Sequence, residues 1–314
     1  MAPPLVPWSP DGFDRYRDLY PQTPRLVPEP DGAGTSQFAA WWTAGEAAAL
    51  RALRSRAANT TVVFVRGYLG RYMPGNLRAA CAAARRLGFD AFVAHNSAGG
   101  TVAGNVRALA QHIRRRSLRS RVIFCGHSRG GVECLALAAH DPDIAARCDG
   151  IALSQTPHGP SRVIESVLLR RWPLSRRRRA AETLQRAGLL LLGARSGGYE
   201  LTPEVWPSIV AGVDHVDWPF PVVQTASWSS RPTAWLDSFH QRLGEIGPGR
   251  AHDGQFFLND LIWPRLPHVL LPNVDHAQPA VGGDGFDHAR YWTALLVTLL
   301  DGQTCRPIAE GTDS

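Results

Sequence analysis

The sequence contains no lysine, so all 34 of its basic side chains are arginines, against 27 acidic ones and a formal net charge of +7. A GC-rich genome biases codons in this way. The arginines cluster at 114–116 and at 176–179. Neither cluster is interleaved with aromatic residues or accompanied by a known binding module, so we expect no nucleic-acid partner. The first cluster ends an expected helix, where cations complement the helix dipole.

Long apolar segments are missing as well. No stretch of about 18 consecutive apolar residues occurs, and we therefore expect no transmembrane helix. The first residues, MAPPLVPWSPDGFDRY, have neither the basic start nor the apolar centre of a signal peptide, which predicts a cytoplasmic protein, with secretion after removal of a signal as the alternative. The five cysteines are odd in number and form no CxxC pair. They indicate free thiols in a reducing compartment, and we expect neither a metal nor an organic cofactor.

The most informative segment that is present reads RVIFCGHSRGG at 121–131. Strand character at 121–125 leads into the G-x-S-x-G motif, and helical character follows at 132–140. This order of strand, sharp turn and helix predicts a nucleophile elbow with Ser128 exposed at the start of the helix. Gly126 and Gly130 are expected because the turn leaves no room for a Cβ at either position.

A serine nucleophile requires a base and an acid that follow it in the order Ser, Asp or Glu, His. His276 is the predicted base, because it lies in a short loop directly after the apolar strand at 268–272. Asp253, 23 residues before it in an Asp-Gly pair, is the predicted acid. Asp260 and Asp237 are the alternatives, whereas Asp275 is too close in sequence to reach the ring of its neighbour easily. The acid would hold the tautomer of His276 and stabilise its imidazolium form.

The oxyanion hole is predicted at the end of an early strand. TVVFV at 61–65 runs into Arg66-Gly67-Tyr68-Leu69-Gly70, and the glycine lets the backbone turn its amides toward the nucleophile. We expect the backbone N–H groups of Tyr68 and Arg129 to be the two donors.

These segments, together with SQTPHGPS at 154–161, HDGQFF at 252–257 and NVDHA at 273–277, resemble the α/β-hydrolases of the bacterial lipase and esterase branch. The resemblance covers roughly residues 60–300. It implies a serine carboxylic-ester hydrolase, including the polyester hydrolases, that acts on a small-molecule or polymeric ester through an acyl-enzyme. A thioesterase or acyltransferase with the same triad is the alternative. The chain departs from the common pattern at Arg66, where lipases often have histidine, and at Arg129, where many have an apolar residue.

Alternating strands and helices predict an α/β fold with a mostly parallel sheet flanked by helices. Strands are expected at 61–66, 90–94, 121–125, 150–154, 221–225 and 268–272, and helices near 75–87, 104–117, 130–140 and 287–301. About 65 residues separate the fourth and fifth of these segments, far more than an ordinary connection. The resemblance makes this insertion a helical lid after strand six of the sheet. The expected parts are an N-terminal surface segment and first helix at 1–60, a core at 61–160 and 219–314, and a lid at 161–218.

Apolar side chains of the lid could shape a substrate site. The candidates there are Leu189 and Leu191, in the run GLLLLG, and Trp206. Leu69 and His127, which adjoin the oxyanion glycine and the serine, complete the predicted substrate-binding set. The alternative for most of these residues is plain packing of the lid onto the body.

Overall fold

The structure is a computed structural model that describes residues 33–169, 176–231 and 237–301, with the side chains at 176–182 and 237–238 left out. Residues 1–32 of the predicted N-terminal segment therefore lie outside the described residues. Within the described ranges, six parallel strands form one sheet in the order β2-β1-β3-β4-β5-β6. The strands are β1 Thr60–Val65, β2 Asp90–Val93, β3 Arg121–His127, β4 Cys148–Ser154, β5 Val222–Trp228 and β6 His268–Pro272.

Strand side chains alternate between two buried clusters, one on each face of the sheet. In β1, Val62 and Phe64 belong to one cluster, and Val63 and Val65 belong to the other. Successive side chains of a strand point to opposite faces, so a sheet buried on both faces needs strands that are apolar at nearly every position. This requirement explains why the strand segments read as continuous apolar runs in the sequence.

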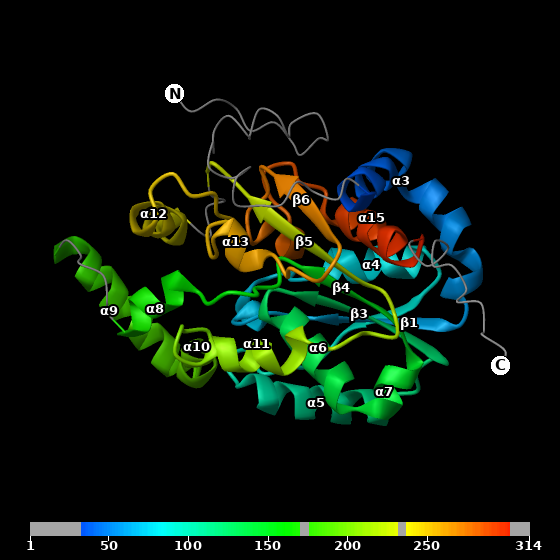
Figure 1. Cartoon of the computed structure of the whole chain (residues 1–314), viewed down its shortest axis with the longest axis horizontal. Coiled ribbons are helices and arrows are strands. Elements are labelled where there is room, and N and C mark those ends of the chain that lie inside the picture. The colour runs from blue at the N-terminus through cyan, green and yellow to red at the C-terminus, as the bar shows by residue number, and fades with distance from the viewer. Residues whose placement is uncertain (1–32, 170–175, 232–236, 302–314) are drawn as a thin grey trace, which may run out of the picture.

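Helices cover both faces of the sheet. The helices of the described residues are α3 Ala33–Ala57, η2 Gly70–Tyr72, α4 Arg78–Arg86, α5 Val102–Arg115, α6 Arg129–His140, α7 Pro142–Arg147, α8 Arg162–Leu169, α9 Arg176–Leu191, α10 Arg195–Glu200, α11 Trp206–Asp214, α12 Asp237–Ile246, α13 Leu258–Leu261, α14 Gln278–Val281 and α15 His288–Asp301. Figure 1 shows α3, α4 and α15 on one face and α5, α6 and α7 on the other. The first layer is joined by aromatic packing, with ring centroids 5.8 Å apart between Phe38 and Tyr291 and 5.3 Å apart between Phe64 and Trp292.

The predicted strands and helices are confirmed, because each overlaps an observed element, and so is the parallel sheet. The insertion is also present, as α8 to α11 between β4 and β5. It follows the fourth strand of the described sheet rather than the sixth. The expected position after strand six came from the family resemblance. The described residues contain no strand before β1, so four strands precede the insertion in this sheet.

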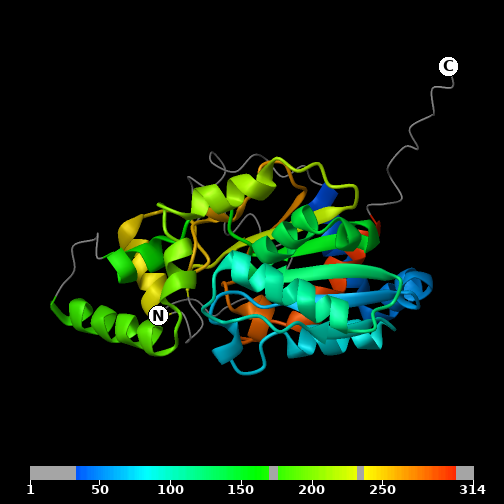
Figure 2. The ribbon, with the colours of Figure 1, turned by 90° about the horizontal axis from the view of Figure 1, so that it is seen from below.

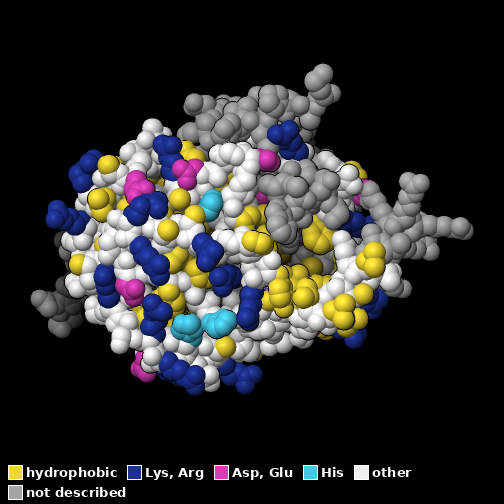
Figure 3. Space-filling view, turned by 180° about the vertical axis from the view of Figure 1, so that it is seen from behind, with side chains coloured by type: hydrophobic (Ala, Val, Ile, Leu, Met, Phe, Trp, Pro, Cys, Tyr) yellow, Lys and Arg dark blue, Asp and Glu magenta, His cyan; other side chains and the backbone are white. Residues whose placement is uncertain are grey.

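The helix α9 lies at the edge of the molecule in both ribbon views (Figures 1 and 2). Its C-terminal part exposes leucines: Leu184 is 74% exposed, Leu190 53% and Leu191 88%. The view from behind shows hydrophobic side chains gathered on the side of the molecule that carries α9, and arginines over the opposite half (Figure 3). No helix in the described ranges is both long enough and apolar enough to cross a membrane.

Candidate active site

Ser128 lies at the sharp turn between β3 and α6. Its backbone has φ 55° and ψ −136°, a region that L residues rarely adopt. The Ser128 N–H donates to the carbonyl of Ser154 on β4 over 2.8 Å, which extends the strand pairing as far as the turn. Since α6 begins at the next residue, Ser128 lies at the positive end of the helix dipole. The backbone turn agrees with the predicted elbow, but Ser128 is buried, at 8% exposed, rather than exposed as the sequence predicted.

The two glycines of the motif are required by close backbone approaches. A Cβ on Gly126 would collide with the backbone of Gly131, and a Cβ on Gly130 would collide with the carbonyl oxygen of Val65 at the end of β1. The prediction that neither position has room for a side chain is confirmed.

His276 and Asp253 are brought together by two hydrogen bonds. The imidazole Nδ1 of His276 lies 2.6 Å from Oδ2 of Asp253, and the His276 N–H donates to the Asp253 carbonyl over 2.9 Å. Both side chains are buried, the carboxylate fully. The other carboxylate oxygen, Oδ1, accepts from the N–H groups of Gln255 and Phe256 at 2.9 Å each. The loop therefore fixes one oxygen of Asp253 and leaves the other for the imidazole.

The other candidate carboxylates have different partners. Asp275 accepts from the N–H groups at the start of α14, over 2.9 Å from Ala277 and 3.0 Å from Gln278. Asp260 lies in α13, and its backbone carbonyl accepts from His158 and Gly159. Burial raises the pKa of the Asp260 carboxyl. The side chain of Asp237 lies outside the described residues.

The loop that carries His276 is held by two buried side chains that the sequence did not mark for this role. His127 Nε2 lies 2.8 Å from the carbonyl oxygen of His276. The amide of Gln155, which follows β4 with φ 48°, donates to the carbonyl of Asp275 over 2.8 Å. His127 was predicted to bind substrate, but its ring is 4% exposed and already holds this loop. The contacts favour a positioning role for His127.

Acid should weaken the fold through His127. Burial and the adjacent His276 lower the pKa of His127 to about 3, and burial lowers that of His252 to about 4. Unfolded histidine has a pKa of about 6.5, so below that pH the unfolded chain binds protons that the folded chain does not. We therefore expect the free energy of unfolding to fall as the pH drops from 6.5 toward 5, with at most about 1.4 kcal/mol per pH unit from each histidine.

Urea unfolding at several pH values measures this slope. The variant His127→Gln keeps an amide donor for the His276 carbonyl. In this variant, the slope of the free energy of unfolding against pH should decrease by the contribution of one titrating histidine. An unchanged slope would show that His127 does not titrate on unfolding.

The oxyanion segment approaches the serine closely. A Cβ on Gly67 would lie 2.7 Å from the Ser128 Cβ and 3.2 Å from its Oγ, so only glycine fits here. The next N–H group, of Tyr68, makes no hydrogen bond within the described residues, whereas Leu69 N–H donates to Ala98. Arg129 is the first residue of α6, and such N–H groups have no partner within their helix. Both predicted donors therefore remain available beside Ser128.

The side chain of Arg129 is fully buried, which the sequence did not predict. Its Nε lies 3.2 Å from Oε1 of Glu133, also fully buried, and its Nη1 donates to the Gly197 carbonyl in α10 over 3.2 Å. The guanidinium carbon lies 5.3 Å from the ring centre of Tyr68. Glu133 also accepts from Asn96 and Asn105. This network, which we call the Arg129 network, joins the oxyanion segment, α6 and the insertion.

Removing Arg129 should destabilise the fold strongly. Arg129→Met leaves the Glu133 carboxylate buried without its cation, and such losses cost about 3–5 kcal/mol. The double variant Arg129→Met/Glu133→Leu should recover a large part of that loss. Arg114→Met, which removes an exposed partner of Asp141, should cost less than about 1 kcal/mol. Urea unfolding of the variants measures these differences, and equal costs at Arg129 and Arg114 would contradict the expectation.

The predicted substrate-binding residues of the insertion are not brought together. Trp206 is fully buried in the core, and its indole cannot touch a substrate in this conformation. Leu189 is 8% exposed and packs in the same core cluster, whereas Leu191 is 88% exposed on the surface of α9. Leu69 is half-buried beside the oxyanion segment, with φ 59°. For Trp206, these contacts favour the alternative of core packing over the predicted substrate contact.

The two leucines should therefore respond differently to truncation. Leu189→Ala should lower the free energy of unfolding by about 2–3 kcal/mol, since it leaves a cavity in the core. Leu191→Ala should change it by less than about 0.5 kcal/mol, because the side chain is already in water. Thermal or urea unfolding of both variants compares them directly. A large loss at Leu191 would mean that this leucine is covered in the folded protein.

No family model and no curated protein sequence matches this chain. Solved structures do match it. A metagenomic carboxyl esterase is 17% identical over 78% of this chain and 76% of its own, with a TM-score of 0.59. The mature form of a lipase from Bacillus licheniformis is 17% identical over 79% of this chain and 92% of its own, with a TM-score of 0.54. At these sequence identities, the similarity is one of fold.

Proposed function

Since the chain has the α/β-hydrolase fold, we propose that it is a serine carboxylic-ester hydrolase of the lipase and esterase kind. The fold hosts many activities, so the proposal depends on the site. The observation that carries it is the pairing of His276 with the buried carboxylate of Asp253, beside the carboxyl end of β3, where the strained Ser128 directly precedes α6.

The proposed reaction proceeds through an acyl-enzyme. His276 takes the proton of Ser128 as the hydroxyl oxygen attacks the ester carbonyl, and the N–H groups of Tyr68 and Arg129 stabilise the oxyanion. His276 then protonates the leaving alcohol. Water attacks the acyl-enzyme by the same steps in reverse and releases the carboxylic acid. Asp253 stays ionised throughout and holds the Nδ1–H of His276 toward itself.

The insertion is proposed to act as a lid over the substrate. Residues 61–160 and 219–314 would form the catalytic core, and residues 161–218 the lid. The part of the insertion around α10 is hydrogen-bonded to the core. Tyr68 Oη donates to the Ala194 carbonyl over 2.7 Å, and Gly197 N–H donates to the Gly99 carbonyl over 3.0 Å. Any opening would therefore involve α9, with its exposed leucines, rather than α10.

Turnover of p-nitrophenyl esters of increasing acyl length tests the proposal, with an acyl-CoA series measured beside it. We expect ester hydrolysis to exceed thioester hydrolysis and acyl transfer to added alcohols. Faster thioester turnover or acyl transfer would favour the alternative of a thioesterase or acyltransferase, which uses the same triad. No turnover in any series would contradict the proposal.

A further inference from the structure

An open depression of about 640 Å³ lies at the end of β2, and no residue of the predicted triad lines it. Its lining comes from three chain segments: η2, the turn after β2, and α5. The lining residues are Arg71, His95, Asn96, Ser97, Ala108, Gln111, His112, Arg115 and Arg116. Three are arginines and two are histidines, and none is acidic. The depression is therefore a concave surface of one charge sign.

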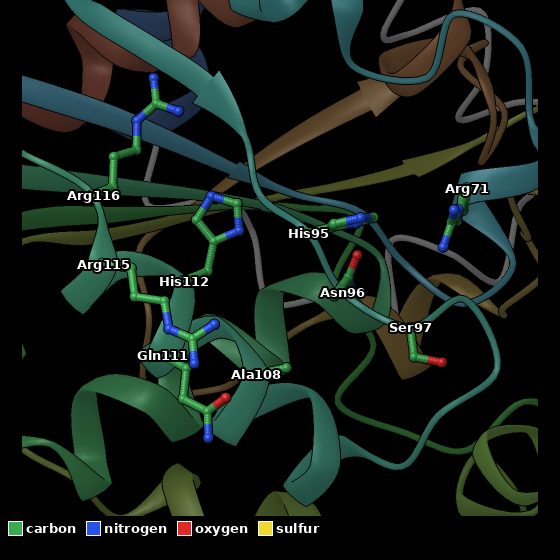
Figure 4. A pocket seen from close by; sticks show the side chains of 9 residues that line it. All are labelled: Arg71, His95, Asn96, Ser97, Ala108, Gln111, His112, Arg115 and Arg116. Carbon is green, nitrogen blue, oxygen red and sulfur yellow. The ribbon is translucent and has the colours of Figure 1, made fainter.

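Arginine and histidine side chains line the depression on both sides. Figure 4 shows Arg115 and Arg116 on one side, Arg71 on the other, and both imidazoles between them. His112 stacks on Phe92 with 5.4 Å between ring centroids, and the guanidinium carbon of Arg116 lies 3.9 Å from the centre of the same ring. Phe92 therefore contacts both the imidazole of His112 and the guanidinium of Arg116.

The arginines of the depression differ from others on the same surface. Arg114, their neighbour in sequence, pairs with Asp141 at 2.6 Å, and Arg121 is likewise bonded to Asp149. Within the described ranges, no ion pair joins Arg71, Arg115 or Arg116 to a carboxylate. The Arg114–Arg116 run therefore divides into one paired arginine and two that face the depression.

The buried carboxylate that contacts the lining, that of Glu133, already has a cationic partner. Asn96 donates to Glu133, which forms the ion pair with Arg129. The other hydrogen bond of the Asn96 amide goes to the carbonyl of Arg66. The floor therefore supplies no free negative charge to balance the guanidinium groups above it.

The geometry points to a binding site for a phosphoryl group, separate from the proposed catalytic serine. Guanidinium groups bind phosphate oxygens with paired N–H donors, and several of them suit a ligand with more than one negative charge. The volume lies in the range of small-ligand sites. The ligand would place its phosphates between Arg71 and the α5 arginines, with His95, His112 and Gln111 within the same lining.

Calorimetric titration of the whole chain with inorganic pyrophosphate at low ionic strength tests this site. We expect saturable binding to one site, weakened about tenfold or more in Arg71→Gln/Arg115→Gln. Both side chains are exposed, so the fold should tolerate the change. The matched control is Arg51→Gln/Arg54→Gln, which removes the same charge from exposed positions on α3 and should bind like the wild type. No saturable binding, or equal weakening in the control, would overturn the assignment.

Histidine signals give a readout that needs no variant. Pyrophosphate should shift the NMR signals of the His95 and His112 imidazoles, with the same saturation as the calorimetric curve. Binding that leaves both signals unmoved would place the ligand elsewhere and overturn the site.

A second arm identifies the source of the phosphate. Phosphatidylcholine vesicles are sedimented with the protein, with and without phosphatidic acid. Sedimentation that requires phosphatidic acid and is reversed by pyrophosphate supports the site and assigns it to a lipid headgroup. Pyrophosphate binding without sedimentation supports the site and assigns it to a soluble phosphate. Both arms measure binding alone, so their outcome does not depend on ester hydrolysis.

Discussion

Under the proposed function, Ser128→Ala is expected to lower kcat for ester hydrolysis by about a millionfold, to near the background rate, as in known serine-hydrolase triads. The alanine methyl group cannot attack the ester carbonyl. No acyl-enzyme therefore forms, and the two-step reaction is lost. Alanine carries the same backbone restriction as serine at φ 55°, so the free energy of unfolding should change by less than about 1 kcal/mol.

Steady-state turnover of a p-nitrophenyl ester by the purified variant measures the loss. Ser120→Ala is the matched control, because Ser120 is exposed and its hydroxyl donates to the exposed Asn59 carbonyl, away from any predicted site residue. It should keep full activity. A Ser128→Ala variant that retains more than a few per cent of the wild-type rate would mean that the nucleophile is another residue.

Asp253→Asn is expected to lower kcat by about ten thousandfold with little change in melting temperature. The asparagine oxygen can keep the bonds from Gln255 and Phe256 N–H groups, which leaves its amide nitrogen toward His276. A nitrogen donor there favours the tautomer that carries its proton on Nε2. That tautomer cannot accept the serine proton.

Asp260→Asn and Asp237→Asn are the controls, and both should stay within about tenfold of the wild type. Asp260 is bonded through its backbone to His158 and Gly159 rather than to His276. If Asp260→Asn is the crippled variant and Asp253→Asn is not, the catalytic acid is Asp260.

The strands were predictable because their chemistry is local. A sheet buried on both faces demands nearly continuous apolar residues, and segments such as TVVFV and HVLLP meet that demand without help from distant residues. The elbow was predictable for a similar reason, since its glycines respond to clashes within one turn and with the adjacent strand.

The polar contacts around the site were not predictable in the same way. Arg129 looked like a departure from an apolar position, and its burial depends on Glu133 one helical turn later and on Gly197 in the insertion. His127 looked like a residue beside the substrate, but it bonds a carbonyl 149 positions away. Trp206 and Leu191 have similar apolar character in sequence, yet one is fully buried and the other exposed. Such differences are set by tertiary packing. The catalytic roles themselves stay predictions until the variants are measured.

The pairing of α3 with α15 has a consequence for how the chain is made. Trp41 and Gln37 of α3 donate to Asp301, the last residue of α15, and Phe38 packs on Tyr291. During synthesis, the face of the sheet that carries α3 and α4 must wait for α15, about 230 residues later. The buried cluster on the opposite face, which includes α5, α6 and α11, has Trp263 as its last fully buried residue and is therefore complete before α15 is made. A chain emerging from the ribosome would therefore expose one apolar sheet face until translation is nearly finished, which makes that interval the vulnerable one for aggregation.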